Sequence, residues 1–137
     1  MPNTPRPLPG VTAAPAHATV VLVDREALYR WFVAESLRGS GVDVVPCQSL
    51  DEAASALREA IAPDLLIVDG DMLEGRAVET LRGVRAEAAA TPCLVLDSGG
   101  DVSLSRLGAV TVAAKPVDTA AVITLVTSQL HRDLPAA

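Results

Sequence analysis

Two carboxylates and one ammonium follow apolar runs of the chain, at the points where these runs end. Asp24 follows the run VVLV, Asp69 follows LLIV, and Lys115 follows VTVAA. Carboxylate oxygens are ligands for hard divalent cations, and an ammonium balances the charge of a phosphoryl group. Brought together by the fold, these three side chains would form a site for a divalent cation and a phosphoryl group.

The elements that must position these residues follow a regular alternation. Short apolar runs alternate with helix-like segments, which is typical of βα units. Ser49 and Glu52 form a capping-box pattern that starts one of the helices. Five such units predict an α/β fold, a doubly wound five-stranded parallel sheet with helices on both faces. Strands are expected near residues 19–23, 42–46, 64–68, 93–96 and 110–114, and helices near 26–38, 49–62, 75–89, 101–107 and 118–130.

The strand order decides whether the three residues meet. In the order 2-1-3-4-5, the strands before Asp24 and Asp69 are neighbours, and ligands bind past the carboxyl ends of such strands. A single aspartate at a strand end is usually a helix cap or a turn former. Three charged residues that follow three different strands favour a functional site instead.

Composition excludes several classes of protein. The net charge of −6 argues against nucleic-acid binding by the domain itself. No apolar stretch approaches the roughly 20 residues of a membrane span, and the N-terminus does not resemble a signal peptide. Cys47 and Cys93 are too few for a disulfide framework or a zinc site, so we expect buried free thiols in a cytoplasmic protein.

The chain divides into three parts. Residues 1–18 are rich in proline and poor in apolar bulk, which predicts a disordered leader. Residues 19–131 carry the βα units and form the expected domain. Residues 132–137 are expected to be a flexible tail.

All three aromatic residues lie within one turn of the first expected helix: Tyr29, Trp31 and Phe32. Leu28, Phe32 or Val33, and Leu37 have the spacing of a core-facing stripe. Trp31 falls off that stripe, so it is either a partner surface or an innocuous exposed aromatic residue.

Three segments resemble the receiver domains of bacterial two-component response regulators, the CheY-like family with a flavodoxin-like fold. They are VVLVDRE, PDLLIVDGDM (63–72) and GAVTVAAKP (108–116), and the resemblance covers about residues 19–131. The separation of Asp24 from Asp69 and the pair Lys115-Pro116 both match the family.

The resemblance implies a signalling protein of a phosphorelay rather than an enzyme. A histidine kinase or phosphotransfer protein would phosphorylate Asp69, and Lys115 would pair with that carboxylate or with the phosphoryl group. Asp24, Asp69 and the backbone carbonyl of Asp71 would hold Mg²⁺. Another signalling protein as partner, or a homodimer, is also compatible with the resemblance.

The chain departs from the family pattern around this site. Arg25 stands in place of the second acidic metal ligand, and Asp97 in place of the switch hydroxyl (Thr or Ser). Val112 replaces the switch aromatic residue, and Leu73 replaces a proline. The expected helix at 101–107 is also about one turn short.

These substitutions have a joint electrostatic interpretation. Arg25 is a permanent cation that would oppose Mg²⁺, so metal binding is expected to be weak. Asp97 would repel a phosphoryl group, and Ser98 could replace the missing hydroxyl only through a bulge. In the alternative interpretation, Arg25 points to solvent and some metal binding survives.

Three functions follow from these observations. The first is an atypical receiver, or pseudo-receiver, whose Mg²⁺-dependent phosphorylation is weakened or lost and whose partner binding is constitutive. The second is an ordinary single-domain response regulator phosphorylated on Asp69. The third is a small phosphatase that uses Asp69 and Asp71, a pair that resembles the motif of haloacid-dehalogenase-type enzymes.

Overall fold

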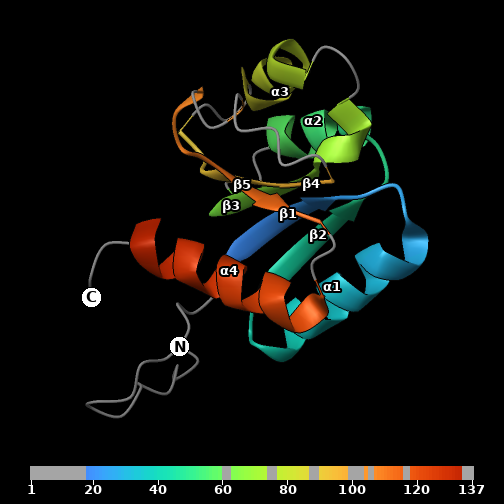
Figure 1. Cartoon of the computed structure of the whole chain (residues 1–137), viewed down its shortest axis with the longest axis vertical. Helices are drawn as coiled ribbons and strands as arrows, with labels where there is room; N and C mark the ends of the chain where they lie inside the picture. The colour runs from blue at the N-terminus through green and yellow to red at the C-terminus, as the bar shows by residue number, and fades with distance from the viewer. Residues whose placement is uncertain are drawn as a thin grey trace.

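The domain is built on one parallel sheet whose strands have the order β2-β1-β3-β4-β5 (Figure 1). The computed structural model describes residues 18–59, 63–73, 77–86, 90–98, 104, 107–115 and 118–133. The strands are β1 (Thr19–Val23), β2 (Asp43–Cys47), β3 (Leu65–Asp69), β4 (Cys93–Asp97) and β5 (Val110–Ala114). The predicted fold class and strand order are therefore confirmed.

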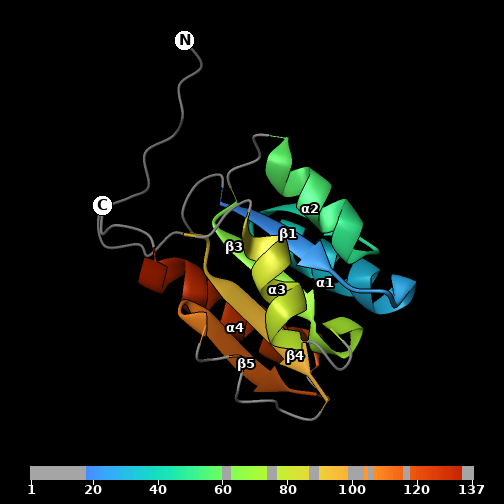
Figure 2. The same cartoon turned by 90° about the horizontal axis from the view of Figure 1, so that it is seen from above.

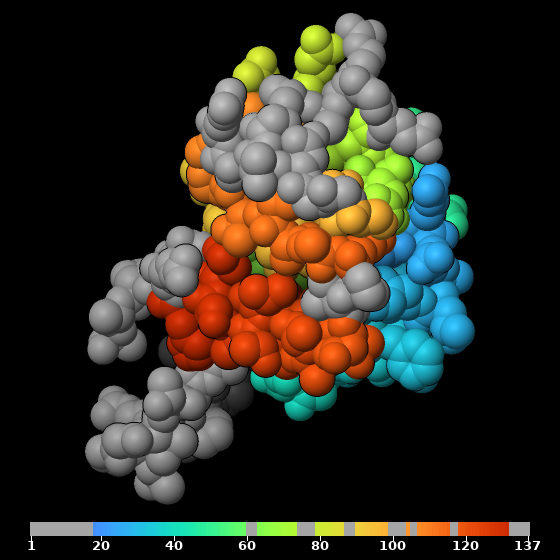
Figure 3. All heavy atoms as spheres, viewed as in Figure 1, coloured from blue at the N-terminus to red at the C-terminus, as the bar shows by residue number. Residues whose placement is uncertain are grey.

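Helices cover both faces of the sheet, which explains why its central strands are continuous apolar runs. Helices α1 (Ala27–Gly39) and α4 (Thr119–Asp133) pack side by side on one face (Figures 1 and 3). Helices α2 (Leu50–Arg58) and α3 (Ala77–Arg85) cover the other face (Figure 2). The further helix expected at 101–107 lies largely outside the described residues.

The register aligns the carboxyl ends of the strands. Val23 in β1 pairs with Val68 in β3, and Asp69 in β3 pairs with Leu96 in β4. Because all strands are parallel, the residues that follow them share one edge of the sheet. This edge is where the sequence predicts the site.

The ends of several elements can be compared with the predictions. The hydroxyl of Ser49 accepts a hydrogen bond from the Glu52 N–H at 3.1 Å, which confirms the predicted helix cap. Ala18 is buried, and its carbonyl accepts a hydrogen bond from the Asp43 N–H, so the folded part begins one residue before the predicted boundary. Helix α4 extends to Asp133, two residues into the expected tail.

The predicted core-facing stripe of α1 is partly wrong. Val33, Ala34 and Leu37 face the sheet and are buried. Three large apolar residues instead form an exposed surface, the α1 apolar patch: Leu28 (69% exposed), Trp31 (56%) and Phe32 (47%). The rings of Trp31 and Phe32 meet edge to face, with centroids 5.1 Å apart. Of the two alternatives Phe32 and Val33, it is therefore Val33 that faces the sheet, and the predicted core position of Leu28 is wrong.

Both cysteines, Cys47 and Cys93, are buried free thiols, as predicted. Among the described residues, no helix is long and apolar enough to cross a membrane.

Candidate functional site

Four charged residues predicted to form the site lie at the carboxyl edge of the sheet. Asp24 and Lys115 directly follow β1 and β5, whereas Asp69 and Asp97 are the last residues of β3 and β4. The backbone N–H of Lys115 donates to the Asp97 carbonyl at 3.0 Å, which holds the ends of β4 and β5 together.

An ion pair between Lys115 and Asp69 forms the centre of the site. Lys115 Nζ lies 2.7 Å from Asp69 Oδ1, and the Asp69 side chain is only 2% exposed. The same Oδ1 accepts the backbone N–H of Asp71 at 3.1 Å. Burial alone would lower the pKa of Lys115, but the hydrogen bond to Asp69 and the nearby carboxylates raise it above its usual value. Lys115 is therefore charged at neutral pH.

Asp24 is the second buried carboxylate. Its Oδ1 accepts the backbone N–H of Glu26 at 2.8 Å, and its carbonyl oxygen accepts a hydrogen bond from Arg30 Nη1 at 2.6 Å. Burial raises the pKa of Asp24, and the negative charge of Asp69 raises it further, although the Glu26 N–H and Lys115 oppose this shift. Two buried carboxylates so close that the charge of one raises the pKa of Asp24 form a natural place for a cation.

The donor set fits Mg²⁺ only in part. Asp24 and Asp69 offer carboxylate oxygens, the ligand type that this ion prefers. The residue after Asp24 is Arg25, whose side chain is exposed and contributes a positive charge instead of a third carboxylate. In the part of the chain that the structure describes, no group of three or more His, Cys, Asp or Glu side chains is arranged to hold a metal ion.

The side chain of Asp71 is a member of the site, although the sequence predicted a role for it only in the phosphatase alternative and otherwise used its backbone carbonyl. Asp71 lies in η1 (Gly70–Leu73), a single turn of 3₁₀ helix directly after β3. Its Oδ1 accepts the Ser98 N–H at 3.1 Å, and its Oδ2 accepts the Ser98 hydroxyl at 2.8 Å and Lys115 Nζ at 3.3 Å. Partial burial would raise the pKa of Asp71, but the bonds from Ser98 and Lys115 outweigh it and lower the pKa. Asp71 is thus a fixed anion beside Asp69.

Ser98 reaches the site without the bulge that the sequence reasoning required. The alternation of side chains applies only within a strand, and β4 ends at Asp97. Ser98 is the first residue of the following turn, so both its N–H and its hydroxyl can turn towards Asp71. The end of the apolar run CLVL at Asp97 was the sequence signal that could have indicated this.

Gly70 allows η1 to pack closely against β4. A Cβ atom at Gly70 would lie 2.7 Å from Cβ of Asp97, 2.9 Å from Asp97 Oδ1 and 2.9 Å from Cγ1 of Val95. Asp97 therefore lies directly beside the Asp69–Asp71 segment, as the sequence predicted.

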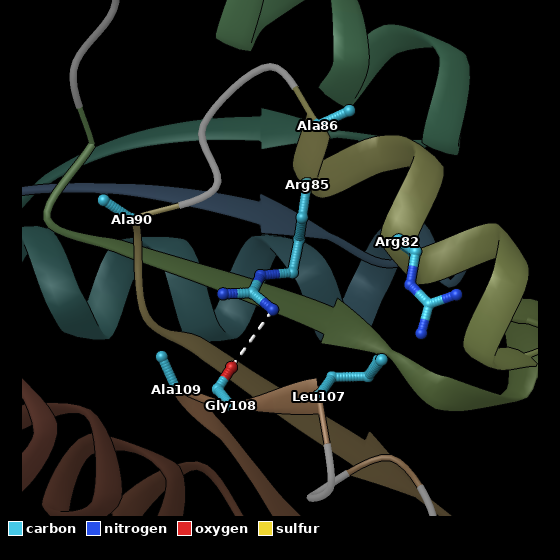
Figure 4. A pocket seen from close by; sticks show the side chains of 7 residues that line it. All are labelled: Arg82, Arg85, Ala86, Ala90, Leu107, Gly108 and Ala109. Carbon is cyan, nitrogen blue, oxygen red and sulfur yellow. Dashed lines mark hydrogen bonds between the residues drawn. The ribbon is translucent and has the colours of Figure 1, made fainter.

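A hollow of about 490 Å³ lies at the opposite edge of the sheet, by the starts of β4 and β5 (Figure 4). Its lining residues are Arg82, Arg85, Ala86, Ala90, Leu107, Gly108 and Ala109. The guanidinium of Arg85 donates to the carbonyls of Gly108 (3.1 Å) and Thr91 (3.3 Å), and thereby ties α3 to the loops before both strands. This arrangement serves the packing of the domain and is separate from the carboxyl-edge site.

Several solved receiver domains have the same fold. The receiver domain of the hybrid histidine kinase CckA is 25% identical to this chain, with a TM-score of 0.68, and the match covers 82% of this chain and 99% of that one. CheY4 of Vibrio cholerae is 25% identical, with a TM-score of 0.70 and coverages of 87% and 100%. A response regulator from Thermotoga maritima is 24% identical, with a TM-score of 0.72 and coverages of 84% and 98%.

No protein-family model matches the sequence, and no curated protein matches it. The fold and the structural similarities agree with the resemblance found in the sequence. The chain therefore has the CheY-like, flavodoxin-like fold, and it is similar in structure to the receiver domains of two-component response regulators.

Proposed function

We propose that this protein is an atypical receiver in a two-component phosphorelay, in which Mg²⁺-dependent phosphorylation is weakened and partner binding is largely constitutive. The observation that carries the proposal is an intact Asp69–Lys115 ion pair in a site whose neighbouring positions are altered. Arg25 stands where a metal-binding acid is expected, and Asp97 where a hydroxyl is expected. In this role the protein is a cytoplasmic signalling protein and not an enzyme.

Residual phosphorylation would use the groups that remain. The Asp69 carboxylate would be the nucleophile, and the Lys115 ammonium would neutralise the charge of the phosphoryl group. Receiver domains generally bind Mg²⁺ at the phosphorylation site. Here Asp24, Asp69 and the Asp71 carbonyl would hold it, and it would supply further charge neutralisation. The fixed charge of Arg25 opposes that ion, which weakens its binding.

Metal affinity is the direct test. We expect Arg25→Asp to bind Mg²⁺ more tightly than the wild type, because the change replaces a cation with an oxygen ligand. The titration can follow the fluorescence of Trp31, which lies on α1 close to the Asp24 loop. Arg25→Gln is a control that removes the charge without adding a ligand, and it should fall between the two. Tight binding in the wild type that is unchanged in Arg25→Asp would contradict the proposal.

The partner surface is the α1 apolar patch. Receiver domains interact with histidine kinases or phosphotransfer proteins, and such a protein must cover the edge that holds Asp69. Helix α1 begins three residues after Asp24, so its exposed Leu28, Trp31 and Phe32 lie beside this edge. Three large apolar side chains in one exposed surface favour a protein partner over solvent.

Constitutive binding has its own test. The hydroxyl and the aromatic residue that would couple phosphorylation to the β5–α4 side are replaced here by Asp97 and Val112. A ligand shifts a conformational equilibrium only through contacts that differ between the two states, and these two replacements remove such contacts. We expect Asp69→Asn to leave partner affinity nearly unchanged, and Trp31→Ala to weaken it. A tenfold effect of a phosphoryl mimic, about 1.4 kcal/mol of coupling, would favour the ordinary response regulator instead.

The phosphatase alternative is less compatible with the site. Such an enzyme would need Asp71 as a general acid, and a general acid must be protonated to act. Bonds from Ser98 and Lys115 hold the pKa of Asp71 below its usual value. Absence of phosphomonoester turnover would agree with this assignment, and turnover that is lost in Asp71→Asn would contradict it.

A further inference from the structure

Three hydrogen-bond donors at the carboxyl edge of the sheet converge on the carboxylate of Asp71. Ser98 contributes two of them, its backbone N–H to Oδ1 at 3.1 Å and its hydroxyl to Oδ2 at 2.8 Å. Lys115 Nζ contributes the third, at 3.3 Å from Oδ2, while it also contacts Asp69 at 2.7 Å. One ammonium, one hydroxyl and one backbone N–H therefore already bind an anion.

A phosphoryl group on Asp69 would require the same kind of donors. It carries a charge of about −1.5 to −2 and three strong acceptor oxygens. Lys115 contacts the Asp69 carboxylate directly, and the Ser98 hydroxyl binds the Asp71 carboxylate oxygen that Lys115 also contacts. The Asp71 carboxylate both uses these donors and repels an approaching anion.

We propose that the Asp71 carboxylate takes up the hydrogen-bond donors that would otherwise bind the oxygens of a phosphoryl group. It thereby limits binding of that group independently of Arg25. This inference rests on the proposed function, because it concerns the same Asp69 site. It assigns a second cause of weak phosphorylation, one that acts on the anion rather than on the metal. Asp71 is a specificity-determining residue under this proposal, not a catalytic one.

The geometry allows this carboxylate to be removed without disturbing the core. The Asp71 side chain is 30% exposed, whereas Asp69 is 2% exposed. Asp71→Asn keeps the shape of the side chain and leaves an oxygen that can still accept the Ser98 N–H. It removes the negative charge, and it releases Lys115 and the Ser98 hydroxyl for another anion.

Two probes separate this inference from the proposal about the metal. The first is inorganic phosphate without any divalent cation, followed through the backbone amide signal of Ser98 by NMR. The second is beryllofluoride with Mg²⁺, followed by fluorine NMR. Asp69→Asn is the control for beryllofluoride binding at Asp69, because it removes the carboxylate to which the mimic attaches. Ser98→Ala is the matched control that keeps the Asp71 charge and removes one donor.

We expect Asp71→Asn to bind phosphate about tenfold more tightly than the wild type, because a like charge beside the ligand is removed. Asp71→Ala should show the same direction, and Ser98→Ala should show no gain. Unchanged phosphate affinity in both Asp71 variants would overturn the inference, even if Arg25→Asp improves Mg²⁺ binding. Tight beryllofluoride binding in the wild type would instead overturn both the inference and the proposed function.

Discussion

Replacement of Gly70 by alanine should destabilise the domain, because the added methyl group has no space. The new Cβ would lie 2.7 Å from Cβ of Asp97 and 2.9 Å from Cγ1 of Val95, inside the distance of about 3.0 Å that real Cβ atoms keep. Val95 is fully buried, and Cβ of Asp97 is fixed to the backbone of β4. Neither can yield without a shift of β4 or η1, and overpacking of this kind costs about 1–3 kcal/mol.

Gly83→Ala is the matched control for this change, because it adds the same methyl group where nothing lies within 4 Å. Gly83 lies within α3, where alanine is favoured over glycine by roughly 0.5–1 kcal/mol. The two substitutions should therefore change the free energy of unfolding in opposite directions. Urea unfolding followed by circular dichroism measures both. If Gly70→Ala were as stable as the wild type, or if Gly83→Ala were the less stable variant, the reasoning from packing would be refuted.

Three further predictions concern buried groups. Cys47 and Cys93 should resist a thiol reagent in the folded protein, because burial raises their pKa to about 11 and about 12; labelling as fast as in urea would contradict this. Arg85→Leu should cost about 1–3 kcal/mol in unfolding experiments, because the buried Arg85 side chain loses its hydrogen bonds to the Gly108 and Thr91 carbonyls; a loss no larger than that of exposed Arg82→Leu would argue against it. Asp24→Asn should stabilise the domain in the presence of a chelator, because burial and the charge of Asp69 raise the pKa of Asp24. A raised pKa means that the folded state holds the proton more tightly, so the advantage of the variant should shrink as the pH falls through that pKa and vanish below the ordinary value of 3.8. A pH-independent advantage in thermal unfolding would show that charge is not its cause.

The sheet and the edge residues could be predicted because their signals are local in the sequence. Runs such as LLIV are too short and too β-branched for helices, and a parallel sheet places the residue after each run at one edge. The Ser49 cap is a pattern of two residues within one turn. Each of these features needs no knowledge of distant contacts.

The parts that could not be predicted depend on tertiary geometry. The contact of Asp71 with Ser98 joins residues 27 positions apart, and it exists because η1 turns the chain directly after β3. The sequence left Phe32 or Val33 open for the core-facing stripe of α1, and only packing against the sheet decides that Val33 is buried while Phe32 and Leu28 are exposed.

The altered site divides into two halves that act on opposite charges. Under the two proposals, Arg25 directly after Asp24 would oppose a cation, whereas Asp71 on η1 would oppose an anion. Between them, Asp69 and Asp24 are buried carboxylates, and buried carboxylates lower the stability of a fold unless a partner compensates them. Lys115 provides that compensation for Asp69, and it is itself shared with Asp71. The negative charge of Asp69 is thus balanced by the chain itself, and this is the physical basis of our proposal that the protein depends little on a phosphoryl group.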